Sequence, residues 1–373
     1  MAIVPSRPKW KGTMTDRERF NRQMHFQPVD RCFNCEFGFW EENFHSWSMF
    51  TKNGVTKNTE ADRFFNFDVY AGVGLSAYLN PAFETKVIRQ TATTKIIQNG
   101  EGLLAEVPLD GHDTIPHFIK SSIEKPEDWE RVKAERLNVN SPSRIIDVKA
   151  LKEHHPAGRD YPLHVHCGSM IGHVRDMLTF EGLAYALYDY PEMVEDMIET
   201  LCQLVERGLD QVLGKIDFDF AGGWEDICFK NGPIVPPSFF DDVIVPRYKR
   251  IHKRLAAAGI DVWYTDCDGD IRPILQRFLD GGINCMFPWE VNSSGHPGES
   301  LDKYGRQLLV MGGVDKIKLG EGPAAIKAYL ETLEPLVKRG GFIPHCDHRC
   351  PPNVKEQDYI YYLDLKEKMF GMA

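Results

Sequence analysis

The fold of this chain is constrained most by an alternation of strand-like and helix-like segments over residues 161–373. Short apolar runs, which are typical of buried strands, are separated by longer segments with helical periodicity, such as the one that begins at Pro191. The strand-like runs cover residues 162–167, 216–221, 260–266, 283–287, 308–311 and 341–345. Alternation of this kind predicts a parallel sheet whose strands are connected by helices.

Two further apolar runs, at residues 32–39 and 65–73, bring the number of expected strands to eight. Eight strands with intervening helices favour a (β/α)8 TIM barrel, which a chain of 373 residues is long enough to form. An open doubly wound sheet usually carries the motif G-x-G-x-x-G after its first strand, and this sequence has none. We therefore predict an α/β protein with a closed (β/α)8 barrel.

One segment interrupts this pattern. Residues 86–109 alternate apolar and polar side chains around Asn99-Gly100, which is a strong signal for a β-hairpin inserted into the barrel. Near the start, T-D-R-E at residues 15–18 forms a capping box, which predicts that a helix begins at Thr15. The expected organisation is therefore a tail over residues 1–14 followed by a single barrel domain over residues 15–373.

The charge balance excludes several classes of partner. The chain has 44 Lys and Arg against 54 Asp and Glu, a formal net charge of -10, and no long basic run, so nucleic acid and anionic membranes are not expected partners. No apolar run has the length of a membrane span, and the first residues lack a signal-peptide core, so we expect a cytoplasmic protein. The nine cysteines are odd in number and scattered, which indicates free thiols.

The ends of the predicted strands carry the polar residues of interest, because barrel enzymes place their chemistry where strands run into βα loops. The run at 260–266 continues as D-C-D-G-D, which places Asp266, Asp268 and Asp270 within five residues. Like charges this close repel unless a cation, a helix N-terminus or protonation relieves them. Asp270 is explained as the cap of a following helix. Asp266 and Asp268 alternate with Cys267, so both are expected to face the barrel mouth.

Other strand ends add acidic and histidine side chains. Glu290 follows the run at 283–287, and H-C-D-H-R-C follows the last strand. Imidazole and carboxylate groups are ligands that suit zinc and related divalent ions. Each group has a plainer alternative: a rim ion pair for Glu290, a hydrogen-bonded loop residue for His348, and a supporting hydrogen-bond network for the earlier strand ends. Those earlier strand ends supply His166, Ser169, Glu225 and Asp226. The residues expected either to line an apolar pocket or to belong to the core are Met170, Phe39, Trp40, Phe44, Trp47, Trp224 and Trp289.

Four motifs give the chain a family resemblance. They are T-D-R-E-R-F-x-R-x-x-H-F-Q-P-V-D-R, P-E-M-V-E-D-M, D-G-D-I-R-P-I-L and G-G-F-I-P-x-x-D-H-x-x-P-P. Together they resemble the uroporphyrinogen decarboxylase superfamily, from about residue 14 to the C-terminus. That superfamily has the (β/α)8 barrel. It includes the porphyrinogen decarboxylase and the cobalamin-dependent methyltransferases that act with methanol, methylamines, chloromethane or methoxylated aromatics.

Within the superfamily, the decarboxylase branch fits less well. Its N-terminal R-Q-A-G-R-Y-type motif binds substrate carboxylates, whereas C-E-F-G-F-W stands in that place here. The methyltransferase branch carries zinc on a His-x-Cys pair, a Glu and a final Cys. Placing Gly269 on the glycine of that motif puts Asp266 at the His and Asp268 at the Cys. Glu290 then lies near the Glu, and His348 lies at the final Cys.

The positions therefore match the family's zinc site, but the ligand types differ. Two thiolates suit an enzyme that activates a thiol acceptor, whereas a carboxylate and imidazole set suits the polarisation of an oxygen. The resemblance thus implies a methyltransferase that takes a methyl group from a methoxylated, aromatic donor. The acceptor would be Co(I) of a corrinoid (cobalamin) carried by a separate partner protein. A divalent metal, with Zn2+ preferred, would activate the leaving oxygen.

The expected metal ligands are Asp268, Glu290 and His348, with Cys267 and Cys346 as alternative ligands. Asp266, Glu225 and His166 are expected to donate a proton or to orient ligands. Two other functions stay open: a metal-independent decarboxylase of a porphyrinogen-like or smaller acid, and a barrel that binds without catalysis. The sequence also leaves a homodimer open.

Overall fold

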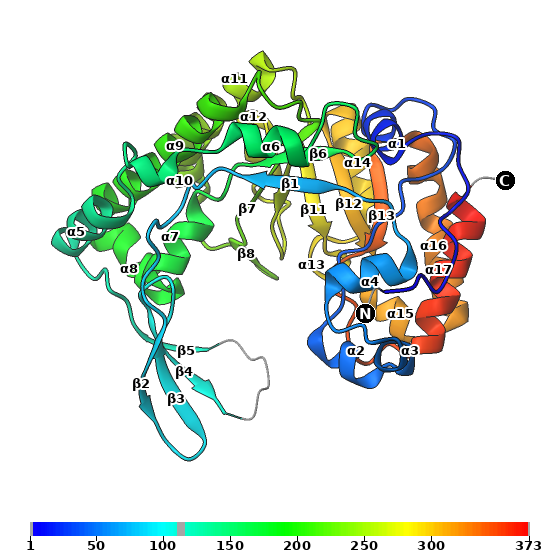
Figure 1. The fold of residues 1–373 in the computed structure, drawn as a ribbon, viewed down its shortest axis with the longest axis horizontal. Coiled ribbons are helices and arrows are strands. Elements are labelled where there is room, and N and C mark those ends of the chain that lie inside the picture. Colours follow the sequence, from blue (N-terminus) through cyan, green and yellow to red (C-terminus); the bar gives the residue numbers. More distant parts are fainter. Residues whose placement is uncertain (1–2, 110–115, 372–373) are drawn as a thin grey trace.

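The computed structural model describes residues 3–109 and 116–371, and its centre is a seven-stranded parallel sheet (Figure 1). The strand order is β1-β6-β7-β10-β11-β12-β13, so each strand lies beside its successor in this series. The strands are β1 (Ala71–Gly74), β6 (Leu163–His166), β7 (Phe220–Trp224), β10 (Trp263–Asp266), β11 (Cys285–Trp289), β12 (Leu309–Val314) and β13 (Phe342–Cys346). All six strands predicted beyond residue 161 are confirmed, although β7 begins four residues later than expected.

The prediction of a first strand at residues 32–39 is wrong. Within this segment the structure shows one isolated bridge, between Phe39 and Cys350, and no strand ladder. Side chains take the place of the ladder. In the side chain of Gln23, Nε2–H donates to the carbonyl of Phe342 in β13 (2.7 Å), and Oε1 accepts from the backbone amide of Phe33 (2.7 Å). The parallel sheet is therefore as predicted, but strand pairing does not close the barrel.

The same segment is held on its other side by Asp68. The Asn34 amide donates to the Asp68 carboxylate (2.9 Å), and the Asp68 amide donates to the Asn34 carbonyl (2.8 Å). Residues 32–39 thus lie between β13 and the approach to β1, at the place of the missing strand. The strand predicted at residues 65–73 is also largely wrong, because Phe65 ends helix α4 and the strand starts only at Ala71.

The helices connect the strands and cover the outside of the sheet (Figure 1). Helix α1 begins as the capping box predicts, with the Thr15 hydroxyl accepting from the Glu18 amide (3.1 Å), and α9 begins at the predicted Pro191. The α-helices before β7 are α1 (Asp16–Met24), α2 (Glu41–Ser46), α3 (Ser48–Asn53), α4 (Asn58–Phe65), α5 (Pro126–Arg136), α6 (Val148–His154), α7 (Ile171–Leu178), α8 (Phe180–Asp189) and α9 (Pro191–Val212). Those after β7 are α10 (Pro237–Phe239), α11 (Val245–Ala257), α12 (Leu275–Gly281), α13 (Val291–Ser294), α14 (Pro297–Tyr304), α15 (Lys316–Gly320), α16 (Pro323–Arg339) and α17 (Glu356–Phe370). Short 3-10 turns at Pro142–Arg144 and Gly305–Gln307 and a π-turn at Phe240–Ile244 complete the set.

The insertion is larger than the predicted hairpin. Strands β3 and β4 pair antiparallel around Asn99-Gly100 as expected, and β2 and β5 extend them to a four-stranded sheet in the order β2-β3-β4-β5. It lies between β1 and β6 in the chain and projects from the barrel (Figure 1). The strands are β2 (Lys86–Gln90), β3 (Thr94–Gln98), β4 (Leu104–Pro108) and β5 (His117–Lys120), and a further small pair is β8 (Cys228–Phe229) with β9 (Gly232–Pro233). No helix among the described residues is long and apolar enough to cross a membrane.

The core has two parts. A large cluster packs the helices against the sheet, and a smaller cluster fills the barrel interior. Phe20 and Met24 of α1 belong to the interior cluster, so α1 covers the amino ends of the strands. The carboxyl ends of the strands face the opposite end of the barrel, where the polar strand ends gather.

The Gln23 contacts give a stability prediction. Replacing Gln23 by Leu leaves the Phe33 amide and the Phe342 carbonyl buried without their present partner, which costs about 1–3 kcal/mol for each group. We expect Gln23→Leu to lower the free energy of unfolding by about 2–4 kcal/mol, measured by urea denaturation. The matched control is Gln27→Leu at an exposed position near the end of the same helix, which should change it by less than about 0.5 kcal/mol. Equal effects of the two variants would contradict the bridging role of Gln23.

Candidate functional site

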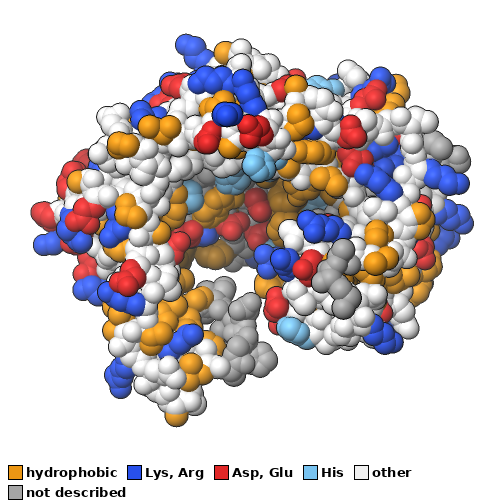
Figure 2. All heavy atoms as spheres, viewed as in Figure 1, with side chains coloured by type: hydrophobic (Ala, Val, Ile, Leu, Met, Phe, Trp, Pro, Cys, Tyr) orange, Lys and Arg blue, Asp and Glu red, His pale blue; other side chains and the backbone are white. Residues whose placement is uncertain are grey.

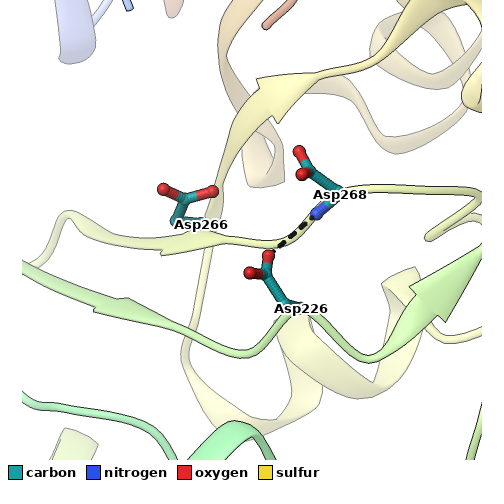
Figure 3. Close-up of side chains that lie close together, drawn as sticks. All are labelled: Asp226, Asp266 and Asp268. Carbon is teal, nitrogen blue, oxygen red and sulfur yellow. Dashed lines mark hydrogen bonds between the residues drawn. The ribbon is translucent and has the colours of Figure 1, made fainter. Parts of the chain in front are cut away.

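Three aspartates from two neighbouring strands form the centre of the candidate site. Asp266 ends β10, Asp268 follows it, and Asp226 follows β7. The two strands are paired in register, with Trp224 opposite Asp266. One carboxylate oxygen from each aspartate lies within 4.8 Å of the other two, and Figure 3 shows the three groups gathered in the loops at these strand ends. In the space-filling view, acidic and histidine side chains lie inside a hollow on this face (Figure 2).

The three carboxylates are poorly compensated by the protein. Burial, followed by the charge of Asp268, raises the pKa of Asp226 to about 6. Burial, followed by the charges of Asp226 and Asp268, raises the pKa of Asp266 well above its usual value. No Lys or Arg among the described residues forms an ion pair with any of the three, and the buried Oδ1 of Asp268 has no hydrogen-bond partner there. In their ionised forms the three carboxylates therefore repel one another without a Lys or Arg partner among the described residues.

Backbone geometry brings the two loops together. The Asp268 amide donates to Oδ1 of Asp226 (3.4 Å; Figure 3), and Asp226 itself has a positive φ of 47°. Gly269 has a φ of +86°, and a Cβ there would collide with the carbonyl oxygen of Cys228 in β8. A glycine is therefore required at position 269 so that the loop after β10 can touch the turn after β7.

His348, a predicted ligand, lies beside the aspartates. Its Nε2 is 3.3 Å from Oδ2 of Asp268, and its ring packs against Phe37 and Trp40, with centroids 5.1 and 5.6 Å away. The aromatic contacts hold the imidazole at the mouth. The structure thus joins His348 with the predicted Asp266 and Asp268. It adds Asp226, which was named among the residues at the earlier strand ends but was not an expected ligand.

Glu290, another predicted ligand, is engaged elsewhere. Its Oε1 is 2.5 Å from Nζ of Lys316, and its Oε2 accepts from the Gly269 amide (2.9 Å). Lys316 therefore neutralises the Glu290 carboxylate, and the hydrogen bond from the Gly269 amide fixes the loop that contains Asp268. These contacts correspond to the rim ion pair that was the plainer alternative for this residue.

Glu225, predicted as a proton donor, is buried and fully hydrogen-bonded. Burial raises its pKa, yet its oxygens accept hydrogen bonds at the start of α7. A carboxylate in this position is favoured by the helix dipole and satisfies free amides. Glu225 thus positions α7 against β7, and its carboxylate does not belong to the group of three aspartates. The donors are the amides of Met170, Ile171 and Gly172, the hydroxyl of Ser169 and the hydroxyl of Tyr248.

His166 lies at the end of β6, partly buried at the mouth. Its Nδ1 accepts a hydrogen bond from the Gly168 amide (3.2 Å), so in the neutral ring the proton is on Nε2. Burial lowers the pKa of His166, which favours this neutral form. The side chain is therefore a hydrogen-bond donor through Nε2.

The cysteines do not approach the aspartates as ligands. All nine lie within the described residues and are buried and free, as predicted. A hydrogen bond with Cys228, followed by burial, raises the pKa of Cys267 well above its usual value. Burial does the same for the pKa of Cys346. Neither cysteine belongs to the group of three aspartates.

Most of the aromatic residues considered for the pocket belong to the core. Met170, Phe39, Phe44, Trp47 and Trp289 are all buried core residues, at 3% exposure or less. Trp40 is half-exposed beside His348, and Trp224 lines a cavity at the mouth together with Tyr78 and His173. Tyr78 and His173 gave no signal in the sequence, because Tyr78 lies in the loop after β1 and His173 lies in the first turn of α7.

Comparison with known proteins places the chain in a family. The solved structure of a methyltransferase from Methanosarcina mazei superposes with a TM-score of 0.58, covering 95% of this chain and 99% of that chain. The two sequences are 12% identical, so the likeness is one of fold. No curated protein sequence matches this chain. The model of the uroporphyrinogen decarboxylase (URO-D) family matches residues 101–366, which is well over half of the chain. The chain therefore belongs to the uroporphyrinogen decarboxylase family.

Proposed function

We propose that this protein is a methyltransferase that demethylates a methoxylated aromatic donor and passes the methyl group to Co(I) of a separate corrinoid protein. We further propose that a divalent cation is held by Asp226, Asp266, Asp268 and His348. Membership of the family and the fold shared with a methyltransferase support the enzyme class. The donor, the cation and the corrinoid partner rest on the chemistry of the site.

The observation that carries the proposal is the group of three carboxylates without a protein counter-ion. Their oxygens lie within 4.8 Å of one another, and Oδ1 of Asp268 is buried without a partner among the described residues. A divalent cation would offset this repulsion and use the free oxygen. The donor set fits such an ion, because carboxylates with one imidazole suit zinc and harder divalent metals.

Each group of the site has a separate role in the proposed reaction. A bound cation supplies Lewis acidity at the leaving oxygen of the donor. Transfer would break the carbon–oxygen bond of the methoxy group, leave the electron pair of that bond on the oxygen, and use the electron pair of Co(I) for the new bond to the methyl carbon. His166, whose Nδ1 accepts from the Gly168 amide, would donate a hydrogen bond through Nε2–H to an oxygen of the donor. Glu225 keeps α7 in place, and Glu290 with Lys316 keeps the loop of Asp268 in place.

The test is an anaerobic assay with free Co(I) cobalamin and a methoxyarene, followed by the visible spectrum. We expect methylation of the cobalt by the purified protein, its loss after chelation and its return on adding Zn2+. Full activity after chelation would remove the cation from the proposal. Release of carbon dioxide from an aromatic acid without cobalamin would instead favour the decarboxylase.

The raised pKa values give a pH prediction for metal binding. A cation must displace the protons of Asp226, whose pKa is about 6, and of Asp266, whose pKa is also raised. Affinity should therefore fall as the pH drops through 6, by about tenfold per pH unit for each proton released. Competition with a chromophoric chelator between pH 5 and 8 measures this. A dissociation constant unchanged between pH 5 and 7 contradicts binding at these aspartates.

A further inference from the structure

A cavity of ≈ 450 Å³ opens at the carboxyl ends of β1, β6 and β7, next to the aspartates. Its walls come from the loop after β1, the end of β6, helix α7 and the end of β7. The side chain of Trp224 lines it, and Trp224 is the register partner of Asp266 and lies two residues before Asp226. The cavity and the three carboxylates therefore lie at the same edge of the sheet, and the end of β7 contributes to both.

The walls of the cavity include flat aromatic surfaces. The rings of Tyr78 and His173 are stacked, with centroids 3.8 Å apart and an interplanar angle of 12°. Trp224 meets the edge of His173 at 4.9 Å and 88°. Leu75 and Leu79 add aliphatic surface. Aromatic walls at right angles suit a flat ring, which can stack on one and meet the other edge-on.

The polar groups of the cavity are uncharged at neutral pH. Among the described residues that line it, none is Asp, Glu, Lys or Arg. Burial lowers the pKa of His166, and it lowers the pKa of His173 to about 3. His166 offers Nε2–H as a donor, because its Nδ1 is occupied by the Gly168 amide. Two arginines contact residues of the walls, but both are engaged with backbone carbonyls: Arg175 lies over the Trp224 ring (5.7 Å) and donates to the Asp226 carbonyl, and Arg144 donates to the carbonyls of Ser76 and Tyr78. A ligand carboxylate would therefore find no free cation on the walls of the cavity.

We propose that this cavity binds the aromatic ring of the methyl donor and selects uncharged methoxyarenes, such as methoxyphenols, over methoxybenzoates. The ring lies against Tyr78 and Trp224, and Nε2–H of His166 donates to a ring oxygen. The choice of a methoxyarene as ligand rests on the proposed function. The selection against carboxylates rests on the cavity walls.

The experiment measures binding to the chelated protein by calorimetry, without cobalamin, using 4-methoxyphenol and 4-methoxybenzoate. We expect the phenol to bind at least tenfold more tightly than the benzoate. Tyr78→Leu and Trp224→Leu should each weaken binding of the phenol at least tenfold. The matched control Tyr188→Leu, on α8 at 89% exposure, should leave it unchanged. Thermal unfolding verifies that each variant folds, and Tyr78→Phe, which keeps the ring, should retain binding.

Two results overturn the inference: unchanged affinity for the phenol in the folded Tyr78→Leu or Trp224→Leu protein, or equal or tighter binding of the benzoate. If Trp224→Leu fails to fold, Tyr78→Leu against Tyr78→Phe decides. Failure of the proposed function gives a different pattern. Native protein that binds methoxyphenol through these residues but transfers no methyl group to Co(I) would leave the ring site standing and remove the methyltransferase. Methyl transfer without measurable binding of the phenol in this cavity would leave the methyltransferase standing and remove the ring site.

Discussion

Replacing Asp268 by asparagine is expected to lower the affinity for Zn2+ at least about 100-fold and to abolish methyl transfer to Co(I) cobalamin. Asp268 lies between the other two aspartates and His348, and its buried Oδ1 is the oxygen left without a partner among the described residues. The amide keeps the size of the side chain but removes its charge. The measurements are the metal content of the purified protein, the zinc dissociation constant and the cobalamin spectrum.

Asp270 supplies a matched control in the same loop. Its carboxylate pairs with Arg272 at 2.7 Å and lies outside the group of three. Asp270→Asn should therefore keep the native metal content, whereas Asp226→Asn and Asp266→Asn should behave like Asp268→Asn. If Asp268→Asn and Asp270→Asn retain equal amounts of metal, the site is not where we propose it.

The parts of the fold that the sequence predicts are those with local signals. In a parallel sheet each strand is buried on both faces. Its sequence is therefore a continuous run of apolar residues between two helical segments. That is why β6, β10, β11, β12 and β13 were found close to their observed bounds. The run at 32–39 has the same composition but forms no ladder. Its backbone is held by Gln23 and Asp68, whose side chains come from other parts of the chain and leave no trace in the local pattern.

In the candidate site too, the residues that the sequence predicts are those with a local signal. Asp266 and Asp268 were predicted because they crowd one strand end, and His348 was named on its position after the last strand. Asp226 lies 40 positions before Asp266 in the sequence, and only the pairing of β7 with β10 shows that the two meet. Glu290 was assigned as a ligand from its place after a strand and near the Glu of the family motif. Its partner Lys316 comes from the end of another strand, so the local sequence does not show the ion pair.

Lys366 gives the largest effect expected on stability. Its ammonium group is fully buried and lies 2.7 Å from Oε1 of Glu36, whose other oxygen accepts from the Cys346 amide in β13 (3.0 Å). This pair joins the segment at 32–39 to α17 and to the sheet, where strand pairing is missing. Lys366→Met removes one charge and leaves the other buried without its counter-ion. We expect a loss of about 3–5 kcal/mol in the free energy of unfolding, measured by urea denaturation.

Two comparisons separate the buried charge from the loss of packing. In the double variant Glu36→Gln/Lys366→Met no uncompensated charge remains, so we expect it to be more stable than Lys366→Met alone, because the neutral amide can still accept from the Cys346 amide. The exposed pair of Lys338 and Glu334 has a similar distance of 2.6 Å. Lys338→Met there should cost less than about 1 kcal/mol, because solvent screens the interaction. If Lys366→Met were no more damaging than Lys338→Met, the segment at 32–39 would be held by its apolar contacts, and the ion pair would have no part in completing the barrel.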